Sequence, residues 1–204
     1  MMNRTIKLLL LSEIFVMTGF GLIEPILAIF INGNIAGGTI FAAGLASMLF
    51  LLTKSVIQLP FSKYVDSHNK KITWLIIGTF IITIVPFVYI FASDITTIYA
   101  AQIIHGIGSA LAYPTWLSLW GTNLDKNKEG FEWSLYSTLT GIGTAATAAV
   151  GAAISEFIGF AATFLIVGLM SLIGCGILFA LEETSERKKK AFAKDYREPI
   201  EEHF

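Results

Sequence analysis

Ionisable and amide side chains lie inside long apolar runs of this sequence, where a charge is costly unless it faces a cavity or a partner. The first run contains the stretch GFGLIEPILAIF, in which Glu24 is followed directly by Pro25. A proline within a helix removes one backbone hydrogen bond and kinks the helix. Kinked or discontinuous helices are tolerated at membrane depth where they line a cavity. We therefore predict that Glu24 and Pro25 line a cavity on a kinked helix.

Glu24 and four further polar side chains fall into two groups by their depth along the apolar runs. At a rise of about 1.5 Å per residue, Glu24 lies roughly 7 Å from the middle of its run, and Gln102 and His105 lie about 3–8 Å from the middle of theirs on the same side. We call these three the outer polar group and predict that they bind a ligand or a proton; the alternative for His105 is a structural bond to a backbone carbonyl. Glu13 and Lys54, the inner polar group, lie about 5–10 Å on the other side. Their opposite charges predict a structural or gating pair, with a direct role in function as the alternative.

The composition indicates a membrane protein. Of the 204 residues, 54% are hydrophobic and 14% are charged, whereas a soluble domain carries about a quarter charged residues. The net charge of -1 gives no support for a nucleic-acid partner. The single cysteine, Cys175, lies in an apolar run, forms no intramolecular disulfide and is predicted to be a small buried hydrophobe. We predict no metal site and no cofactor.

Short polar breaks divide the apolar sequence into stretches that are each long enough to cross a bilayer, which takes about 20 residues. The first stretch is too long for a signal peptide and is not followed by a small-residue cleavage site, so it reads as a retained span. The fold class is therefore an all-α polytopic membrane protein with six transmembrane helices. The predicted spans are residues 7–31, 39–61, 72–92, 95–120, 133–155 and 160–181, followed by a charged tail over 182–204.

Apart from Lys54 within the second span, lysine and arginine are confined to the two termini and to alternate breaks, which predicts the orientation of the chain. The breaks after spans one, three and five contain neither residue. Both termini are therefore expected on the cytoplasmic side of a membrane, for which we predict the prokaryotic inner membrane. The basic cluster in the tail is a topology signal or, alternatively, a contact with anionic lipid headgroups. The basic residues on which this orientation rests are Arg4 and Lys7, then Lys63, Lys70 and Lys71, then Lys126 and Lys128, and finally Arg187 and Lys188 to Lys190.

The fifth span contains TGIGTAATAAVGAAI, which has hardly any bulky side chain. Small residues let membrane helices approach closely, so Gly141, Gly143 and Gly151 are predicted to pack against another helix of this chain or of a second copy. The serine within GIGSA, Ser109, raises the possibility of a membrane protease. That reading is set aside because G-x-S-x-G is absent and the sixth span has no histidine, so we predict that the chain is not an enzyme.

The order of these features resembles the amino-terminal six-helix half of the major facilitator superfamily. The stretch GFGLIEPILAIF resembles the first-helix motif of drug-exporting members, and SKYVDSHNKK resembles the family loop G-x-L-x-D-R-x-G-R-K. Asp66 fits the acidic position of that loop, and Lys70 with Lys71 fits its basic pair. Ser62 and Asn69 stand in place of its two glycines, and Ser67 stands in place of its first arginine.

The fourth span, QIIHGIGSA, resembles the family motif R-x-x-Q-G-x-G-A-A. Gly106 and Gly108 match it, while Gln102 replaces the arginine and His105 replaces the glutamine. The fifth span has glycines of the antiporter motif without its Gly-Pro pair. These departures leave uniport and other forms of coupling open beside proton antiport.

The resemblance implies a secondary transporter of a small solute that works by alternating access. Glu24 would be the coupling or substrate-binding carboxylate, in a cavity shared with Tyr113 and Trp116. Because family members have two six-helix halves, we predict a parallel homodimer in which span two meets span five of the partner, with the three glycines at that seam. The alternatives are a non-transporting scaffold, half of a heteromer, or a shortened twelve-span protein.

Overall fold

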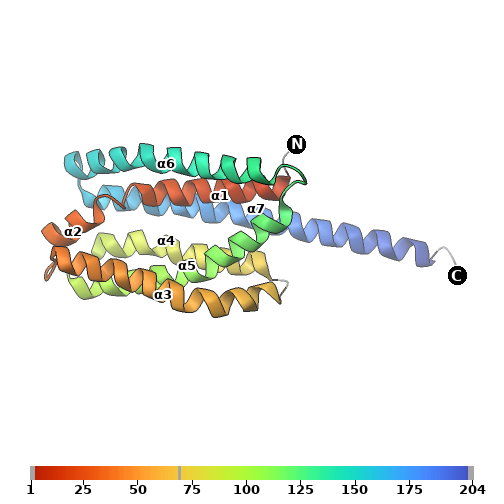
Figure 1. Ribbon diagram of the computed structural model, residues 1–204, viewed down its shortest axis with the longest axis horizontal. Coiled ribbons are helices and arrows are strands. Elements are labelled where there is room, and N and C mark those ends of the chain that lie inside the picture. The colour runs from red at the N-terminus through yellow and green to blue at the C-terminus, as the bar shows by residue number, and fades with distance from the viewer. Residues whose placement is uncertain (1–2, 69, 202–204) are drawn as a thin grey trace.

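The computed structural model is all-helical over the residues it describes, 3–68 and 70–201, with side chains described as far as Glu183. Its helices lie roughly along one long axis, and α7 continues past the end of the bundle (Figure 1). An isolated bridge between Ala36 and Asp94 joins the loops that precede α3 and α5. The helices are α1 (Arg4–Gly21), α2 (Leu27–Asn34), α3 (Ile40–Asp66), α4 (Lys71–Phe91), α5 (Ile95–Asn123), α6 (Glu129–Phe157) and α7 (Phe160–Glu201).

Five helices in the described part are long and apolar enough to cross a membrane: α3, α4, α5, α6 and the segment Phe160–Glu183 of α7. The predicted first span differs, because it is divided into α1 and α2 by a turn over residues 22–26. Pro25 has no N–H to donate, and its ring disfavours a continuous helix through Glu24. The chain therefore leaves the helix at the Glu24–Pro25 pair and resumes it at Leu27.

Local capping explains where several helices begin. Thr39 precedes α3, and its side chain accepts a hydrogen bond from the N–H of Ala42. Asp94 precedes α5, and its carboxylate accepts hydrogen bonds from the N–H and the hydroxyl of Thr97, each at 2.9 Å. These bonds satisfy donors that the first turn of a helix leaves free, and they lower the pKa of Asp94 below its ordinary value.

The helices form two groups of three, which Figure 1 shows lying one above the other. One group contains α3, α4 and α5; the other contains α1, α6 and α7, and α4 packs on α7 to join them. Close approach depends on small residues at the crossings, since a Cβ on Gly78 would meet the Ala112 backbone and one on Gly174 would meet Ser12. Cys175 is buried, as predicted.

Two of the three glycines predicted for the dimer seam, Gly143 and Gly151 of α6, pack within this chain. A Cβ on Gly143 would collide with Thr18, and one on Gly151 would collide with the backbone of Leu22. Gly141 has open space around it. The expectation that all three glycines lie at a seam between two copies is therefore wrong for Gly143 and Gly151, whose small size is used against α1.

Candidate binding cavity

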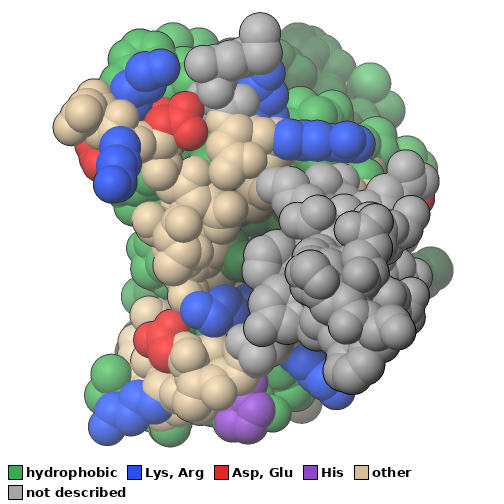
Figure 2. Space-filling model, turned by 90° about the vertical axis from the view of Figure 1, so that its right-hand side faces the viewer, with side chains coloured by type: hydrophobic (Ala, Val, Ile, Leu, Met, Phe, Trp, Pro, Cys, Tyr) green, Lys and Arg blue, Asp and Glu red, His purple; other side chains and the backbone are tan. Residues whose placement is uncertain are grey.

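A cavity of about 350 Å³ lies between the two helix groups. The end-on view shows the molecule hollowed along one side, with Lys, Arg, Asp and Glu side chains gathered at the end facing the viewer (Figure 2). A volume of this size is typical of sites for small organic ligands. Its walls come from α1, α3, α4, α5 and the turn over residues 22–26, with single contributions from α2 and α6. The lining residues are Glu13, Val16, Met17, Phe20, Ile23, Glu24, Leu27, Ser47, Phe50, Lys54, Leu75, Thr79, Ile82, Tyr89, Gln102, His105, Ser109, Ala112, Tyr113, Trp116 and Thr144.

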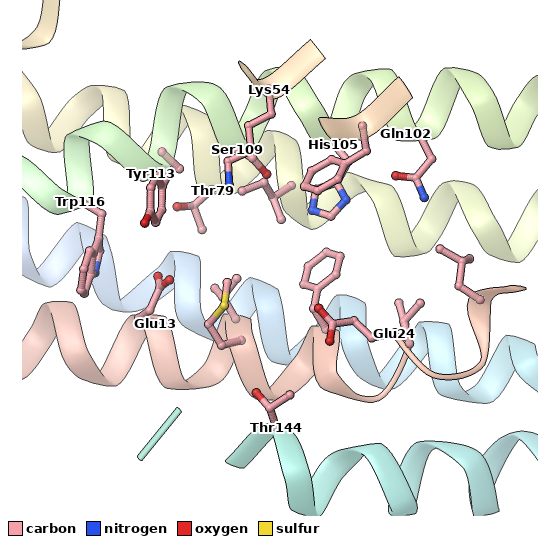
Figure 3. A pocket seen from close by; sticks show the side chains of 18 of the residues that line it. Glu13, Glu24, Lys54, Thr79, Gln102, His105, Ser109, Tyr113, Trp116 and Thr144 are labelled. Carbon is pink, nitrogen blue, oxygen red and sulfur yellow. The ribbon is translucent and has the colours of Figure 1, made fainter. Parts of the chain in front are cut away.

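The outer polar group meets in this cavity. Glu24 projects from the break between α1 and α2, and Gln102 and His105 project from α5 on the facing wall (Figure 3). Pro25 acts on the backbone that carries Glu24 and is not among the lining residues. Gln102 is only 4% exposed, whereas Glu24 is exposed to the open side of the cavity. The depth argument from the sequence thus brought together three residues that do share a cavity.

The ring of His105 is held between two phenylalanines. Its centroid lies 4.8 Å from that of Phe20 on α1 and 4.4 Å from that of Phe50 on α3, and both pairs are stacked. This stack links both helix groups across the middle of the cavity. Sequence reasoning missed both phenylalanines, because an aromatic residue in an apolar run gives no signal that separates a cavity wall from a packed core.

The inner polar group also faces the cavity, but its members are not directly paired. Among the described side chains, no ion pair joins Glu13 to Lys54, although each lies within the electrostatic influence of the other. The amine of Lys54 instead lies 4.5 Å from the centroid of the Tyr113 ring and 6.0 Å from that of Phe50. Equal depth placed the two charges in one cavity, but it does not determine the direction in which each side chain points. The two members of the predicted structural or gating pair are therefore not joined by a direct ion pair in this structure.

Trp116 lines the same cavity as Lys54 and Tyr113, and its indole N–H is a hydrogen-bond donor without an acceptor among the described residues. The residue is 3% exposed. Its ring stacks on Trp120 at 4.9 Å and contacts Tyr136 on α6 at 4.7 Å. A buried indole N–H normally finds an acceptor. Trp116 therefore has an uncommitted donor at the cavity wall.

The loop residues Asp66 and Lys71 lie apart from the cavity and tie three helices together. The amine of Lys71 lies 3.8 Å from the carboxylate of Asp66 and donates a 2.7 Å hydrogen bond to Ser118 on α5. The hydroxyl of Ser118 in turn donates to Asp66 at 3.1 Å. Lys70 is exposed, and Asn69 lies outside the described residues. Asp66 at the end of α3 and Lys71 at the start of α4 are thus connected to α5 through Ser118.

Comparison with known proteins finds relatives whose names are those of membrane transporters. The chain is 24% identical over 190 residues to an uncharacterised MFS-type transporter of Methanocaldococcus jannaschii, which covers 93% of this chain and 48% of that protein. It is 25% identical over 175 residues to a multi-drug resistance efflux pump PmrA homolog of Lactococcus lactis, covering 84% of this chain and 43% of the pump.

A shorter match, 25% identical over 113 residues, is to the proton-coupled antiporter flippase LtaA of Staphylococcus saprophyticus; it covers 54% of this chain and 26% of that protein. The chain thus spans less than half the length of each of these relatives. The family model described as Major Facilitator Superfamily matches residues 9–204. With apolar helices that are long enough to cross a bilayer, this chain is an integral membrane protein that belongs to the major facilitator superfamily.

Proposed function

We propose that this chain is a secondary transporter of a small solute that works by alternating access, with Glu24 as its principal coupling or substrate-binding carboxylate. The observation that carries the proposal is the position of Glu24 at a helix break, facing a cavity opposite Gln102 and His105. An ionisable side chain at membrane depth is costly and is retained where it serves a pathway. A scaffold has no comparable use for a carboxylate in such a cavity.

A second six-helix unit would complete the cavity, and we propose a parallel homodimer in which α3 of one copy packs on α6 of the other. These are the least buried of the five long apolar helices, and a two-fold axis would close both contacts at once. The open side of Gly141 remains available for this seam. Half of a heteromer and a non-transporting scaffold are the alternatives. The exposed apolar residues include Met48, Leu51, Leu52, Val56 and Leu59 on α3, and Leu139, Ile142 and Val150 on α6.

Proton coupling is a candidate driving force, since one relative carries the name of a proton-coupled antiporter flippase and another that of a multi-drug efflux pump. Glu24 is the residue that would bind the proton, or a cationic group of the substrate, from the open side of the cavity. His105, held in its aromatic stack, would form the facing wall. We further propose that the membrane is the prokaryotic inner membrane and that both termini are cytoplasmic.

The test is a transport screen in proteoliposomes, with and without an imposed pH gradient. Wild type is compared with Glu24→Gln and with Glu156→Gln, a control that removes an exposed carboxylate outside the cavity. We expect Glu24→Gln to abolish either uptake or its response to the gradient, and Glu156→Gln to behave as wild type. A solute that Glu24→Gln moves at the wild-type rate, with the same pH dependence, would overturn the role of Glu24.

A further inference from the structure

Two opposite charges face each other across one end of the cavity, and among the described side chains neither has an ion-pair or hydrogen-bond partner. Glu13 comes from α1 and Lys54 from α3, which belong to the two different helix groups. Figure 3 shows Glu13 on the lower wall and Lys54 on the upper wall, with Tyr113 near both. Charges in an apolar environment are costly unless each is paired and hydrogen-bonded. Each wall therefore presents a charge that a bound molecule can neutralise.

Aromatic and donor groups complete this end of the cavity. The centroids of the Tyr113 and Phe50 rings lie 4.5 Å and 6.0 Å from the Lys54 amine. Trp116 adds the buried Nε1–H that has no acceptor among the described residues. Val16, Ile82 and Ala112 supply apolar surface nearby. The walls thus combine a cation, an anion, a spare donor and flat rings.

We propose that this end of the cavity binds a zwitterionic molecule with a flat apolar body, which rests on and narrows the proposed function by naming its substrate class. The anionic group of the ligand pairs with Lys54 and its cationic group pairs with Glu13, which leaves Glu24 as the carboxylate that binds the proton. The flat body lies against Tyr113 and Phe50, and an acceptor atom takes the hydrogen bond from Trp116. A molecule with one charge leaves the opposite wall unpaired, which is the basis of selectivity.

The proposal is tested with four probes that share a phenyl ring and a short chain. Phenylalanine carries both charges, phenethylamine carries only the positive charge, 3-phenylpropanoate carries only the negative charge, and 3-phenylpropanamide carries neither. Binding of radiolabelled probes to the purified protein in lipid nanodiscs is measured by equilibrium dialysis. We expect phenylalanine to bind about tenfold or more tightly than either singly charged probe, since one added charge-assisted contact gives about that factor.

Matched variants assign each charge to its wall. Lys54→Met should bring phenylalanine down to the affinity of phenethylamine, while Lys63→Met, at the exposed end of α3, should keep the wild-type order. Glu13→Gln should bring phenylalanine down to the affinity of 3-phenylpropanoate, and Glu156→Gln should not. The wild-type ranking needs no variant, so the test remains decisive if a substitution prevents folding.

A singly charged or neutral probe that binds as tightly as phenylalanine would overturn the proposal, and so would binding of none of the four. Failure of the inference is separable from failure of the proposed function. Phenylalanine that binds with the expected ranking but is not moved across proteoliposomes would leave the site standing and remove transport. Transport of another solute that depends on Glu24, together with a flat ranking, would leave transport standing and remove the zwitterion site.

Discussion

The amine nitrogen of Lys54 lies 4.5 Å from the centroid of the Tyr113 ring, and within the described chain it forms no ion pair with Glu13 on the facing helix. A lysine over an aromatic face is attracted by the quadrupole of the ring, which contributes about 0.5–2 kcal/mol. This cation–π contact holds the charge on the α3 side of the cavity. It leaves both charges able to respond to a ligand.

The first prediction concerns the coupling between these two charges. Glu13→Gln, Lys54→Met and the double variant should have nearly additive effects on the midpoint of thermal unfolding in detergent. The coupling energy should be below about 0.5 kcal/mol, as for residues without a direct contact. A direct pair would instead give a coupling of up to about 3 kcal/mol, and that result would show that the two side chains meet.

The second prediction concerns the contact between α1 and α6. Gly151→Ala should destabilise the protein by about 1–3 kcal/mol, because the new methyl group would collide with the backbone of Leu22. Gly130→Ala is the matched control on the same helix, with nothing near its Cβ position. It should leave stability unchanged or slightly higher, owing to the better helix propensity of alanine. Equal unfolding midpoints for the two variants would contradict this packing.

The third prediction is a pH dependence at the start of α5. Hydrogen bonds from Thr97 lower the pKa of Asp94, so its contribution to stability is present above the pKa of the unfolded chain. That contribution is lost as the pH falls through the lower pKa of the folded protein. Asp94→Ala should therefore lower the unfolding midpoint at neutral pH, and the difference from wild type should shrink in acid. A difference that is constant with pH would show that the carboxylate charge does not contribute.

The fourth prediction concerns orientation. In a Cys175→Ser background, single cysteines at Asn34 and Glu156 should react with a membrane-impermeant thiol reagent added outside intact cells. A cysteine at Lys126 should react only after the cells are opened. The basis is the alternation of basic and non-basic breaks along the chain. Labelling at Lys126 from outside would reverse or abolish the proposed topology.

The fold class and the family were predictable because the lengths of the apolar runs, the alternation of charged breaks and the order of the motifs can be read from the linear sequence. None of them depends on how the helices pack. The same arithmetic of rise per residue placed Glu24, Gln102 and His105 in one cavity. It also placed Glu13 and Lys54 in that cavity, but it could not predict whether they form an ion pair, because depth along a helix does not determine the direction in which a side chain leaves it. It also could not choose the partner of Gly143 and Gly151, since small residues suit a helix of the same chain as well as one from a second copy.

The aromatic neighbours of His105 could not be predicted from the sequence either. Phe20, Phe50 and His105 come from three helices, and their stacking depends on how those helices are rotated against one another. No short motif encodes that rotation. The break at Glu24–Pro25 was easier to anticipate, because the proline effect is local to the backbone.

That break also has a mechanical meaning. α1 packs with α6 and α7, whereas α2 packs on α3 of the other group, and hydrogen bonds of Ala36 to Ser93 and Ile95 fasten the loop after α2 to the start of α5. The chain therefore passes from one helix group to the other at residues 22–26. If the two groups rotate against each other, these few residues act as a hinge whose backbone angles absorb part of the motion. Glu24 lies within this hinge, so its carboxylate would be displaced by the same movement that opens or closes the cavity.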